Sequence, residues 1–200
     1  MPQQRERTLV LIKPDGVQRS LIGEIIRRYE RTGLKLAALK FFIPAEEFVE
    51  KHYLSDEGWL ESVGKKSIAS YEKRGAKPPF SDAVECGKAV LGRLIKYLAS
   101  GPVVAMIWEG NQAVGIVRKI TGGTEPLSSD VGTIRGDLTI DSYELGDMDE
   151  RAIRNLIHAS GSPAEAEKEI NLWFKEEEII KYNIIQEKIL YDVNLDGIKE

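Results

Sequence analysis

The sequence predicts one folded domain, or at most two small ones, that mixes β-strands with α-helices. Its 200 residues and 42% hydrophobic share are sufficient to bury a core, so extensive disorder is excluded. Residues 8–53 alternate between the periodicity of a strand and that of a helix, in the order strand, helix, strand, helix. The longest apolar runs, Leu9 to Ile12 and Val103 to Trp108, are far shorter than the roughly 20 residues that cross a bilayer, so we expect no membrane span.

Charge and cysteine content limit the partners and the compartment. The 28 Lys and Arg side chains against 32 Asp and Glu give a formal net charge of -4, whereas a dedicated nucleic-acid binder is usually basic. The one cysteine of the sequence, Cys86, cannot form an intrachain disulfide, and the polar stretch Pro2 to Arg7 does not resemble a secretory signal. We therefore expect a cytoplasmic protein.

A strand, a turn and an amphipathic helix are expected at the start of the chain. Thr8 to Lys13 is β-branched and aliphatic, and Pro14-Asp15-Gly16 after it has the composition of a turn. From Leu21 onward, apolar residues recur at helical spacing with Arg and Glu between them. Gly33 is the residue type that ends a helix in the left-handed conformation, so we expect the helix to stop there.

A second strand, a second helix and an insertion follow. Leu34 to Ile43 alternates imperfectly, as a strand does, and Pro44 to Tyr53 predicts a helix with proline at its start. Ser55 to Lys88 is rich in Ser, Lys, Glu and Gly, and we expect an insertion that contains one helix packed on the body. Core periodicity resumes near Ala89 and predicts the next helix, which runs to Leu98.

The second half of the chain begins with a strand and a helix and continues into a long loop. Val103 to Glu109 is apolar, and Ala113 to Ile120 has helical spacing up to Gly122-Gly123. Thr121 to Asn155 carries turn residues and charges with little periodicity, which in a compact domain favours a functional loop. Within it we expect a second, acidic and solvated insertion around Asp141 to Glu150.

The last helix has the clearest start. Ser162-Pro163-Ala164-Glu165 combines an N-cap serine, a proline at the first helical position and a glutamate three residues after the cap, the pattern of a capping box. This pattern follows the short apolar segment Leu156-Ile157-His158 and predicts a helix up to Phe174. From Lys175 onward we expect a polar tail.

Gly58 to Ser67 ends in Gly-Lys-Lys-Ser and superficially resembles a phosphate-binding P-loop. The spacing is wrong, because five residues separate Gly58 from Gly64 and the additional Lys65 displaces the Lys-Ser pair. No apolar strand precedes the segment either. We therefore expect no P-loop here.

His158 is the candidate nucleophile of the chain. An imidazole just before a helix N-terminus could accept a phosphoryl group that the helix dipole stabilises. A histidine at such a place is also commonly structural, and the residues alone leave both interpretations open. His52 lies beside Lys51 in a polar helix, where we expect it on the surface.

Phosphoryl transfer depends mostly on placement and charge neutralisation, so the site needs cations. Three candidates stand at expected loops: Lys13 before Pro14, Arg118 before the Gly122-Gly123-Thr124 loop, and Arg135. Each one alone is equally consistent with a solvated side chain.

Five blocks of sequence together resemble the signature of the nucleoside diphosphate kinase family. They occur in the family's order along nearly the whole chain, and they are Ile12 to Arg19, His52-Tyr53, Gly101 to Met106, Gly132 to Asp137 and Asn155 to His158. The helical segment Glu167 to Ile170 with Trp173-Phe174 is similar as well.

The resemblance implies an α+β fold, a ferredoxin-like β-α-β-β-α-β sandwich with an antiparallel sheet, in one domain over residues 1–200 with a long insertion and a C-terminal extension. It also implies that the γ-phosphate of a nucleoside triphosphate, typically ATP, passes to a nucleoside diphosphate by a ping-pong route through phosphorylated His158, which maintains nucleoside triphosphate pools. The alternative is a regulatory protein on the same fold that binds nucleotide without turnover. An RNA-binding module of similar topology would need exposed aromatic residues and a basic face.

The resemblance also assigns residues to the nucleotide. Lys13 and Asn155 would bind the ribose hydroxyl, and Lys13 would also reach phosphate. Arg118 and Thr124 would hold the β-phosphate, and Arg135 would face the group in transfer.

Around the nucleophile, the resemblance implies three supporting side chains. Tyr53 would lie against His158, Glu169 would orient the imidazole through a hydrogen bond, and Ser160 would support it. After the histidine the family's usual Gly-Ser-Asp is here Ala159-Ser160-Gly161, so an acidic residue near the site is missing.

The base side of the implied site departs from the family pattern. Val90 stands where the family has an aromatic residue, so we expect Val90 and Leu94 to give an apolar contact to the base, with Phe80 as an alternative ring. We also expect the insertion over residues 55–88 to form a flap near the nucleotide entrance, although an inert surface embellishment is as consistent with the sequence.

The implied cofactor is Mg2+, held mainly by the nucleotide phosphates because the sequence shows no clustered carboxylate site. The implied partners are nucleoside di- and triphosphates and further copies of the chain, in a hexamer or a tetramer. We expect neither a membrane nor a nucleic acid as a partner.

Overall fold

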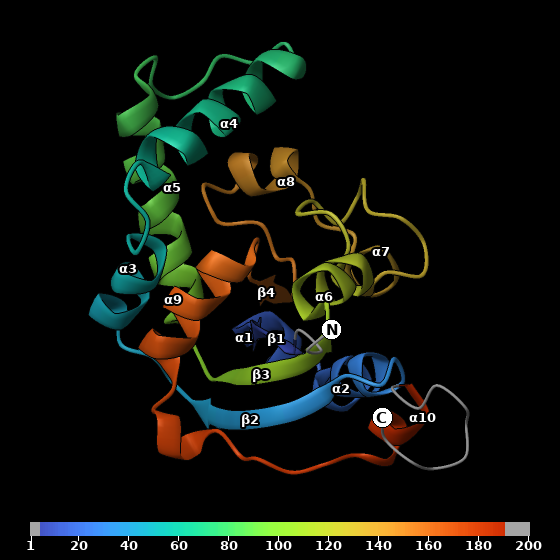
Figure 1. The fold of residues 1–200 in the computed structure, drawn as a ribbon. Coiled ribbons are helices and arrows are strands. Elements are labelled where there is room, and N and C mark those ends of the chain that lie inside the picture. The colour runs from blue at the N-terminus through green and yellow to red at the C-terminus, as the bar shows by residue number, and fades with distance from the viewer. Residues whose placement is uncertain (1–4, 191–200) are drawn as a thin grey trace.

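The fold is built on one antiparallel sheet, as Figure 1 shows. The computed structural model describes residues 5–190. Its strands pair in the order β2-β3-β1-β4, and they are β1 (Arg5–Ile12), β2 (Lys35–Phe42), β3 (Val103–Asn111) and β4 (Ile157–Ala159). This order and the intervening helices are the ferredoxin-like arrangement, so the predicted α+β fold class is confirmed.

Helices cover both faces of the sheet because successive residues of its central strands point to opposite sides. Within residues 5–190 the helices are α1 (Pro14–Gln18), α2 (Ile22–Glu30), α3 (Glu46–Tyr53), α4 (Trp59–Lys73), α5 (Ala83–Leu98), α6 (Ala113–Thr121), α7 (Ile134–Leu138), α8 (Tyr143–Met148), α9 (Pro163–Trp173), the 3-10 helix η1 (Glu176–Glu178) and α10 (Ile185–Leu190). Leu9 and Leu11 of β1 pack with α3, α5 and α9, whereas Val10 and Ile12 pack with α2, α6 and α7.

Most element predictions are confirmed, but the predicted turn at Pro14-Asp15-Gly16 is wrong. These residues begin the short helix α1. Pro14 lies in its first turn, where a backbone N–H would have no acceptor within the helix, so the missing N–H of proline costs no hydrogen bond. Asp15 then accepts hydrogen bonds from the Tyr97 hydroxyl at 2.6 Å and from the backbone N–H of Leu156 at 3.2 Å. Long-range contacts of this kind stabilise a helical turn that the local composition does not reveal.

The insertion consists of α4 and the first turns of α5, which together form a helical hairpin that projects from the sheet (Figure 1). The predicted helix at Ala89 begins earlier, at Ala83, because the side chain of Asp82 caps it by accepting from the N–H of Glu85 at 2.9 Å. The two helices cross closely at Gly64 and Gly87. A Cβ atom at Gly64 would overlap the carbonyl oxygen of Ala83, so only glycine permits this approach.

Most residues of the acidic segment Asp141 to Glu150 are exposed, as predicted, but its first residue is not. Asp141 is buried and forms an ion pair with Arg151 at 2.6 Å. Asp147 of α8 accepts from Arg93 of α5 at 3.0 Å and also pairs with Arg74. These ion pairs attach α8 to the hairpin above it (Figure 1).

The chain beyond α9 packs along the sheet edge, whereas the sequence predicts a polar tail there. Ile179 is buried, and the N–H of Ile180 donates to the carbonyl of Ala37 in β2 at 2.8 Å. The Tyr182 hydroxyl donates to the carbonyl of Leu36 at 2.9 Å. This segment therefore covers the first part of the edge strand β2. Among residues 5–190 we find no helix with the length and apolar character needed to span a bilayer.

The close crossing of α4 and α5 predicts opposite effects for two glycine-to-alanine substitutions. Gly64→Ala should lower the free energy of unfolding by about 1–3 kcal/mol, because the added methyl group meets backbone that cannot move without separating the helices. Gly92→Ala, in α5 with no neighbouring atom within 4 Å, should raise it by roughly 0.5–1 kcal/mol, because alanine favours a helix. Urea unfolding measures both. Equal stabilities of the two variants would contradict the crossing.

Candidate active site

One cavity brings together the predicted nucleotide-binding residues. It has a volume of about 390 Å³ and lies between the α4–α5 hairpin, the α6–α7 region and the strand β4. The predicted residues that line it are Lys13, Tyr53, Val90, Leu94, Arg118, Thr124, Arg135, Asn155 and His158. Phe80, the alternative ring for the base, is not among the lining residues.

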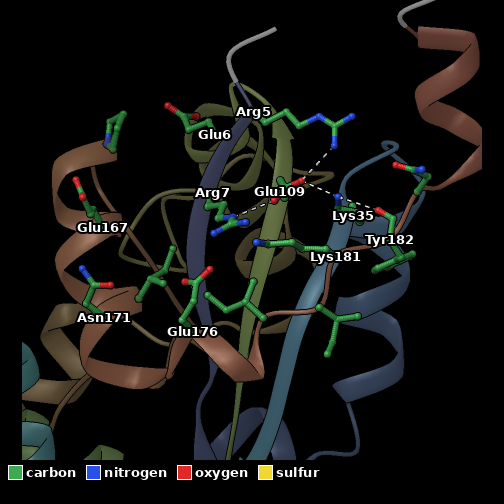
Figure 2. Close-up of a pocket in the computed structure, with 15 residues that line it drawn as sticks. Arg5, Glu6, Arg7, Lys35, Glu109, Glu167, Asn171, Glu176, Lys181 and Tyr182 are labelled. Carbon is green, nitrogen blue, oxygen red and sulfur yellow. Dashed lines mark hydrogen bonds and ion pairs between the residues drawn. The ribbon is translucent and has the colours of Figure 1, made fainter. Parts of the chain in front are cut away.

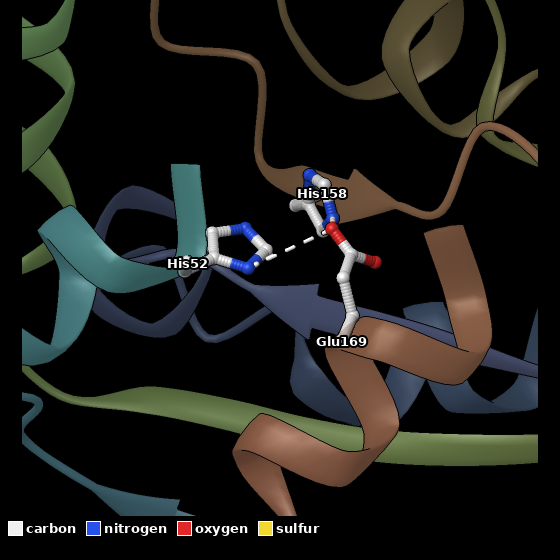
Figure 3. Close-up of side chains that lie close together, drawn as sticks. All are labelled: His52, His158 and Glu169. Carbon is white, nitrogen blue, oxygen red and sulfur yellow. Dashed lines mark hydrogen bonds and ion pairs between the residues drawn. The ribbon is translucent and has the colours of Figure 1, made fainter. Parts of the chain in front are cut away.

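Glu169 and Ser160 lie behind His158 and hold it. The Nε2 atom of His158 is 2.7 Å from Oε1 of Glu169, and the Ser160 hydroxyl donates to Oε2 of the same carboxylate at 2.6 Å. Ser160 is fully buried and its oxygen accepts the N–H of Leu9 in β1 at 3.2 Å. A row of hydrogen bonds thus connects the central strand to the histidine, and Figure 3 shows Glu169 reaching up from α9 toward it.

The partner of Nε2 determines which ring nitrogen of His158 can react. Burial alone would raise the pKa of Glu169, but the opposing charge and the hydrogen bond of His158 outweigh it and hold the pKa below its usual value. An ionised carboxylate can only accept, so the proton of a neutral His158 ring is on Nε2. The Nδ1 atom then keeps its lone pair, and His158 lines the cavity.

His52 is buried, so the prediction of a surface position is wrong. Its exposed fraction is 3%, and its ring centroid lies 4.6 Å from that of His158 and 4.8 Å from that of Tyr53. The indole N–H of Trp173 donates to Nδ1 of His52 at 3.2 Å. A polar helix sequence does not reveal this burial, because it results from packing against α9.

The implied contact of Tyr53 with His158 stays a prediction, because the described residues show no ring contact between the two side chains.

His52 is an uncharged neighbour of the candidate nucleophile. Burial, followed by the charge of His158, lowers its pKa to about 3, so the ring is neutral at physiological pH. Its Nδ1 lies 3.6 Å from Glu169, the contact drawn in Figure 3, but a neutral ring that already accepts from Trp173 forms no ion pair there.

The same three side chains, His52, His158 and Glu169, are close enough to one another to suggest a metal site. Nδ1 of His52 is however occupied by the Trp173 N–H, and Nε2 of His158 by Glu169. A metal ion held at these two nitrogens would have to break both hydrogen bonds, so they fit a hydrogen-bonded support better than a metal centre.

Lys13 and Asn155 form a buried polar pair on the cavity wall. The Lys13 ammonium donates to Oδ1 of Asn155 at 2.7 Å, and the Asn155 amide donates to the carbonyl of Thr124 at 2.9 Å. Burial, followed by repulsion from Arg135, lowers the pKa of Lys13 to about 7. The site therefore holds a cation that lacks a full counter-charge, and an anionic ligand would supply one.

Arg135 organises the loops around the cavity. It donates to the carbonyls of Asn155, Gly122, Gly123 and Ile157, which leaves one of its five N–H groups free. Burial lowers its pKa to about 10, so it remains charged at neutral pH. Gly122 has φ of +89° and lies against Thr133, so a side chain there would displace the loop that Arg135 holds.

The cavity is strongly cationic, as polyphosphate binding requires. Among the described residues that line it, Asp147 is the one carboxylate, and it is already paired with Arg74 and Arg93. The lining cations are Lys13, Lys66, Arg93, Arg118, Arg135 and Arg151.

Sequence reasoning missed several residues of the cavity wall. Lys66, Ser67 and Ser70 come from α4, Arg93 from α5, and Tyr143, Asp147 and Arg151 from the α8 region. Lys66 and Ser67 belong to the Gly-Lys-Lys-Ser segment, which lacks the spacing of a P-loop. That segment was the sequence signal that could have pointed to these two residues of the cavity wall. The N-terminal turn of α9, predicted to stabilise phosphate, contributes no residue to the lining.

A second cavity, of about 750 Å³, lies along β1, β3 and the C-terminal segment and shares no residue with the first. Figure 2 shows Arg5, Arg7 and Lys35 converging on Glu109 there. Burial would raise the pKa of Glu109, but Lys35 and Arg7 outweigh it and lower the pKa. Glu187 also pairs with Arg5 and Lys35, so these cations already have carboxylate partners. This cavity is therefore a structural ion-pair cluster without the reactive groups of the first.

Comparison with known proteins agrees with this geometry. A model of the family described as nucleoside diphosphate kinase matches residues 6–60 and 69–179. The chain is 48% identical over 180 residues to the nucleoside diphosphate kinase of Pyrobaculum aerophilum, which covers 88% of this chain and 98% of that relative. A crystal structure of an NDP kinase from Pyrobaculum aerophilum aligns with a TM-score of 0.85 at 46% identity, over 88% of this chain and 100% of that one.

A second solved structure is a transition-state mimic of nucleoside-diphosphate kinase from Borrelia burgdorferi with bound vanadate and ADP. It aligns with a TM-score of 0.75 at 36% identity, over 92% of this chain and 95% of that one. The sheet order, the cationic cavity and these extensive alignments lead to one conclusion: this chain belongs to the nucleoside diphosphate kinase family of phosphotransferases.

Proposed function

We propose that the enzyme transfers the γ-phosphate of a nucleoside triphosphate to a nucleoside diphosphate through a phosphohistidine at His158. The observation that carries this proposal is the hydrogen bond from Nε2 of His158 to Glu169, because it leaves the lone pair on Nδ1 of a residue that lines the cavity. In the first half-reaction Nδ1 attacks the γ-phosphorus, the bond from phosphorus to the β-γ bridging oxygen breaks, and the diphosphate leaves. In the second, a β-phosphate oxygen of the acceptor attacks the phosphorus and the P–N bond breaks.

The cavity cations neutralise the charge of the phosphates during transfer. In this proposal Arg118 and Thr124 hold the β-phosphate, and the remaining N–H of Arg135 meets the transferred group. Lys13 and Asn155, which already form a hydrogen bond to each other, contact the ribose hydroxyl, and Lys13 also contacts phosphate. Glu169 and Ser160 act through the histidine ring that they hold.

We propose that Mg2+ enters the site with the nucleotide. Asp147 is the carboxylate among the described lining residues, and its pairing with Arg74 and Arg93 leaves it poorly suited to hold a metal ion. The phosphate oxygens of the nucleotide are hard ligands that chelate Mg2+. When bound, the ion would neutralise phosphate charge, while the residues of this chain position the phosphates and the imidazole.

Replacement of the nucleophile gives the direct test. Wild-type protein incubated with γ-labelled ATP should take up an acid-labile, base-stable label and pass it to GDP, whereas His158→Ala should take up none, because no other side chain at the site is proposed to form the P–N bond. The measurement is gel autoradiography followed by nucleotide chromatography. Retained transfer in His158→Ala would reject the proposal, and tight binding without transfer by wild type would favour the regulatory alternative.

The lowered pKa of Lys13 predicts that nucleotide binding takes up a proton above pH 7. In the free enzyme Lys13 has a pKa of about 7 and is mostly neutral at pH 8.5, and the phosphates of a bound nucleotide raise this pKa, so the ammonium form returns. Calorimetric titration of ADP at pH 8.5, in two buffers of different ionisation enthalpy, should show uptake of nearly one proton. Lys13→Arg stays charged throughout and should show almost none. Zero uptake by wild type would contradict the assignment.

We also propose that the chain is one domain that assembles into a homo-oligomer, a hexamer or a tetramer, in the cytoplasm. Beyond the part of β2 that the C-terminal segment covers, Leu39 and Phe41 of β2 and Ile43 just after it are apolar and exposed, which supports burial against another copy. Cys86 is a free, buried thiol, which is consistent with a reducing compartment.

The exposed edge of β2 gives an oligomer test. Sedimentation of the wild-type protein should give four or six times the chain mass of 22.4 kDa. Phe41→Glu places a charge on the exposed apolar edge. It should raise the dissociation constant of the oligomer at least about tenfold and thereby shift the population toward smaller species. A monomeric wild-type protein would contradict the assembly.

A further inference from the structure

The nucleotide cavity has a wall that the family model does not account for. The match to that model is interrupted at residues 61–68, and Val63, Lys66 and Ser67 of this interval line the cavity together with Ser70. All four belong to α4. The insertion therefore contributes side chains to the site itself, on the side of the hairpin.

This wall is fixed in place by contacts at both ends of α4. Gly64 crosses α5 at Gly87 so closely that neither position accepts a Cβ atom without a shift of backbone. Near its C-terminal end, Arg74 pairs with Asp147 of α8, and Asp147 also pairs with Arg93 of α5. The helix is thus held between α5 and α8 (Figure 1), so its side chains that line the cavity keep a defined position.

The wall lies on the base side of the cavity if the phosphates bind as proposed. The reacting phosphate must reach His158, and Lys13 and Arg118, the proposed phosphate ligands, line the same cavity. Val90 and Leu94 of α5, the expected contacts of the base, also line the cavity, and α5 is the helix against which α4 packs. Apolar side chains can contact the faces of a base, while the polar side chains of α4 that line the cavity can form hydrogen bonds with its edge.

We propose that Lys66, assisted by Ser67 and Ser70, recognises the edge of the base and favours 6-oxopurine nucleotides over adenine nucleotides. This inference rests on the proposed function, because it uses the orientation of nucleotide that phosphotransfer through His158 requires. A lysine ammonium only donates hydrogen bonds. Guanine and hypoxanthine present the O6 and N7 acceptors, whereas adenine presents its N6 amino donor beside N7. Lys66 has no ion-pair partner within residues 5–190, so its ammonium is available to a ligand.

Equilibrium binding of three diphosphates isolates the group that is recognised. IDP differs from ADP at the 6-position of the purine, and GDP adds the 2-amino group. Calorimetric titration of the intact protein should give dissociation constants for IDP and GDP that are about fivefold to tenfold lower than for ADP, the range expected for one solvent-accessible charged hydrogen bond. In Lys66→Met, which keeps an unbranched apolar side chain but removes the ammonium, the three constants should agree within about twofold.

Lys65 provides a matched control. It is the neighbouring lysine on the same helix, it pairs with Glu61 and it does not line the cavity. Lys65→Met removes the same charge and should leave the preference for IDP over ADP unchanged.

Two results would overturn the inference. The first is equal binding of IDP and ADP by the wild-type protein. The second is an equal loss for all three nucleotides in Lys66→Met, which would assign Lys66 to the phosphates. Because binding is measured without turnover, its result is separate from the proposed reaction. Base preference without phosphotransfer would reject the proposed reaction alone. Phosphotransfer without base preference would reject this inference alone.

Discussion

The hydrogen bond between His158 and Glu169 is the contact on which the candidate site depends. It joins a side chain of the edge strand β4 to one of α9, at 2.7 Å, and it is anchored through Ser160 to the backbone of β1. A hydrogen bond to a charged group contributes roughly 1.5–3 kcal/mol, and an unpaired buried carboxylate costs more. The fold therefore gains stability from the same contact that leaves one nitrogen of the imidazole free to react.

The surroundings of this contact are arranged to keep positive charge where phosphate is expected. His52 packs against His158, the candidate nucleophile, but remains neutral, so it adds no charge behind the ring. Lys13 and Arg135, in contrast, line the cavity, and burial lowers the pKa of both. Such groups are energetically unfavourable in the free protein and become favourable beside an anion, which is a common arrangement in sites built for ligand binding.

Patterns that depend on neighbours in sequence are the ones that predict the structure well. The strand at Thr8, the helix ending near Gly33 and the N-cap at Ser162 each follow from a local rule, and the structure contains them. The turn expected at Pro14 fails because Asp15 is held by Tyr97 and Leu156, both far away in the chain. His52 is buried for the same kind of reason, since Trp173 covers it.

The candidate site likewise contains residues that sequence patterns predict and residues whose position depends on distant contacts. The family blocks lead to the residues that surround His158, because their order and spacing are retained along the chain. Lys66 and Ser67 could not be assigned to the cavity from sequence, since their position depends on how α4 crosses α5 and on the ion pairs of Asp147. No local rule predicts a helix crossing between two glycines 23 positions apart.

The crossing at Gly64 and Gly87 also constrains how the insertion changes over evolutionary time. Each glycine faces main-chain atoms of the opposite helix, so a smaller side chain nearby cannot compensate for a larger residue at either position. Residues on the outward faces of both helices are free to change, whereas the crossing angle between α4 and α5 stays constant. Descendants of this chain can therefore exchange the residues that face the ligand while the scaffold that carries them stays the same.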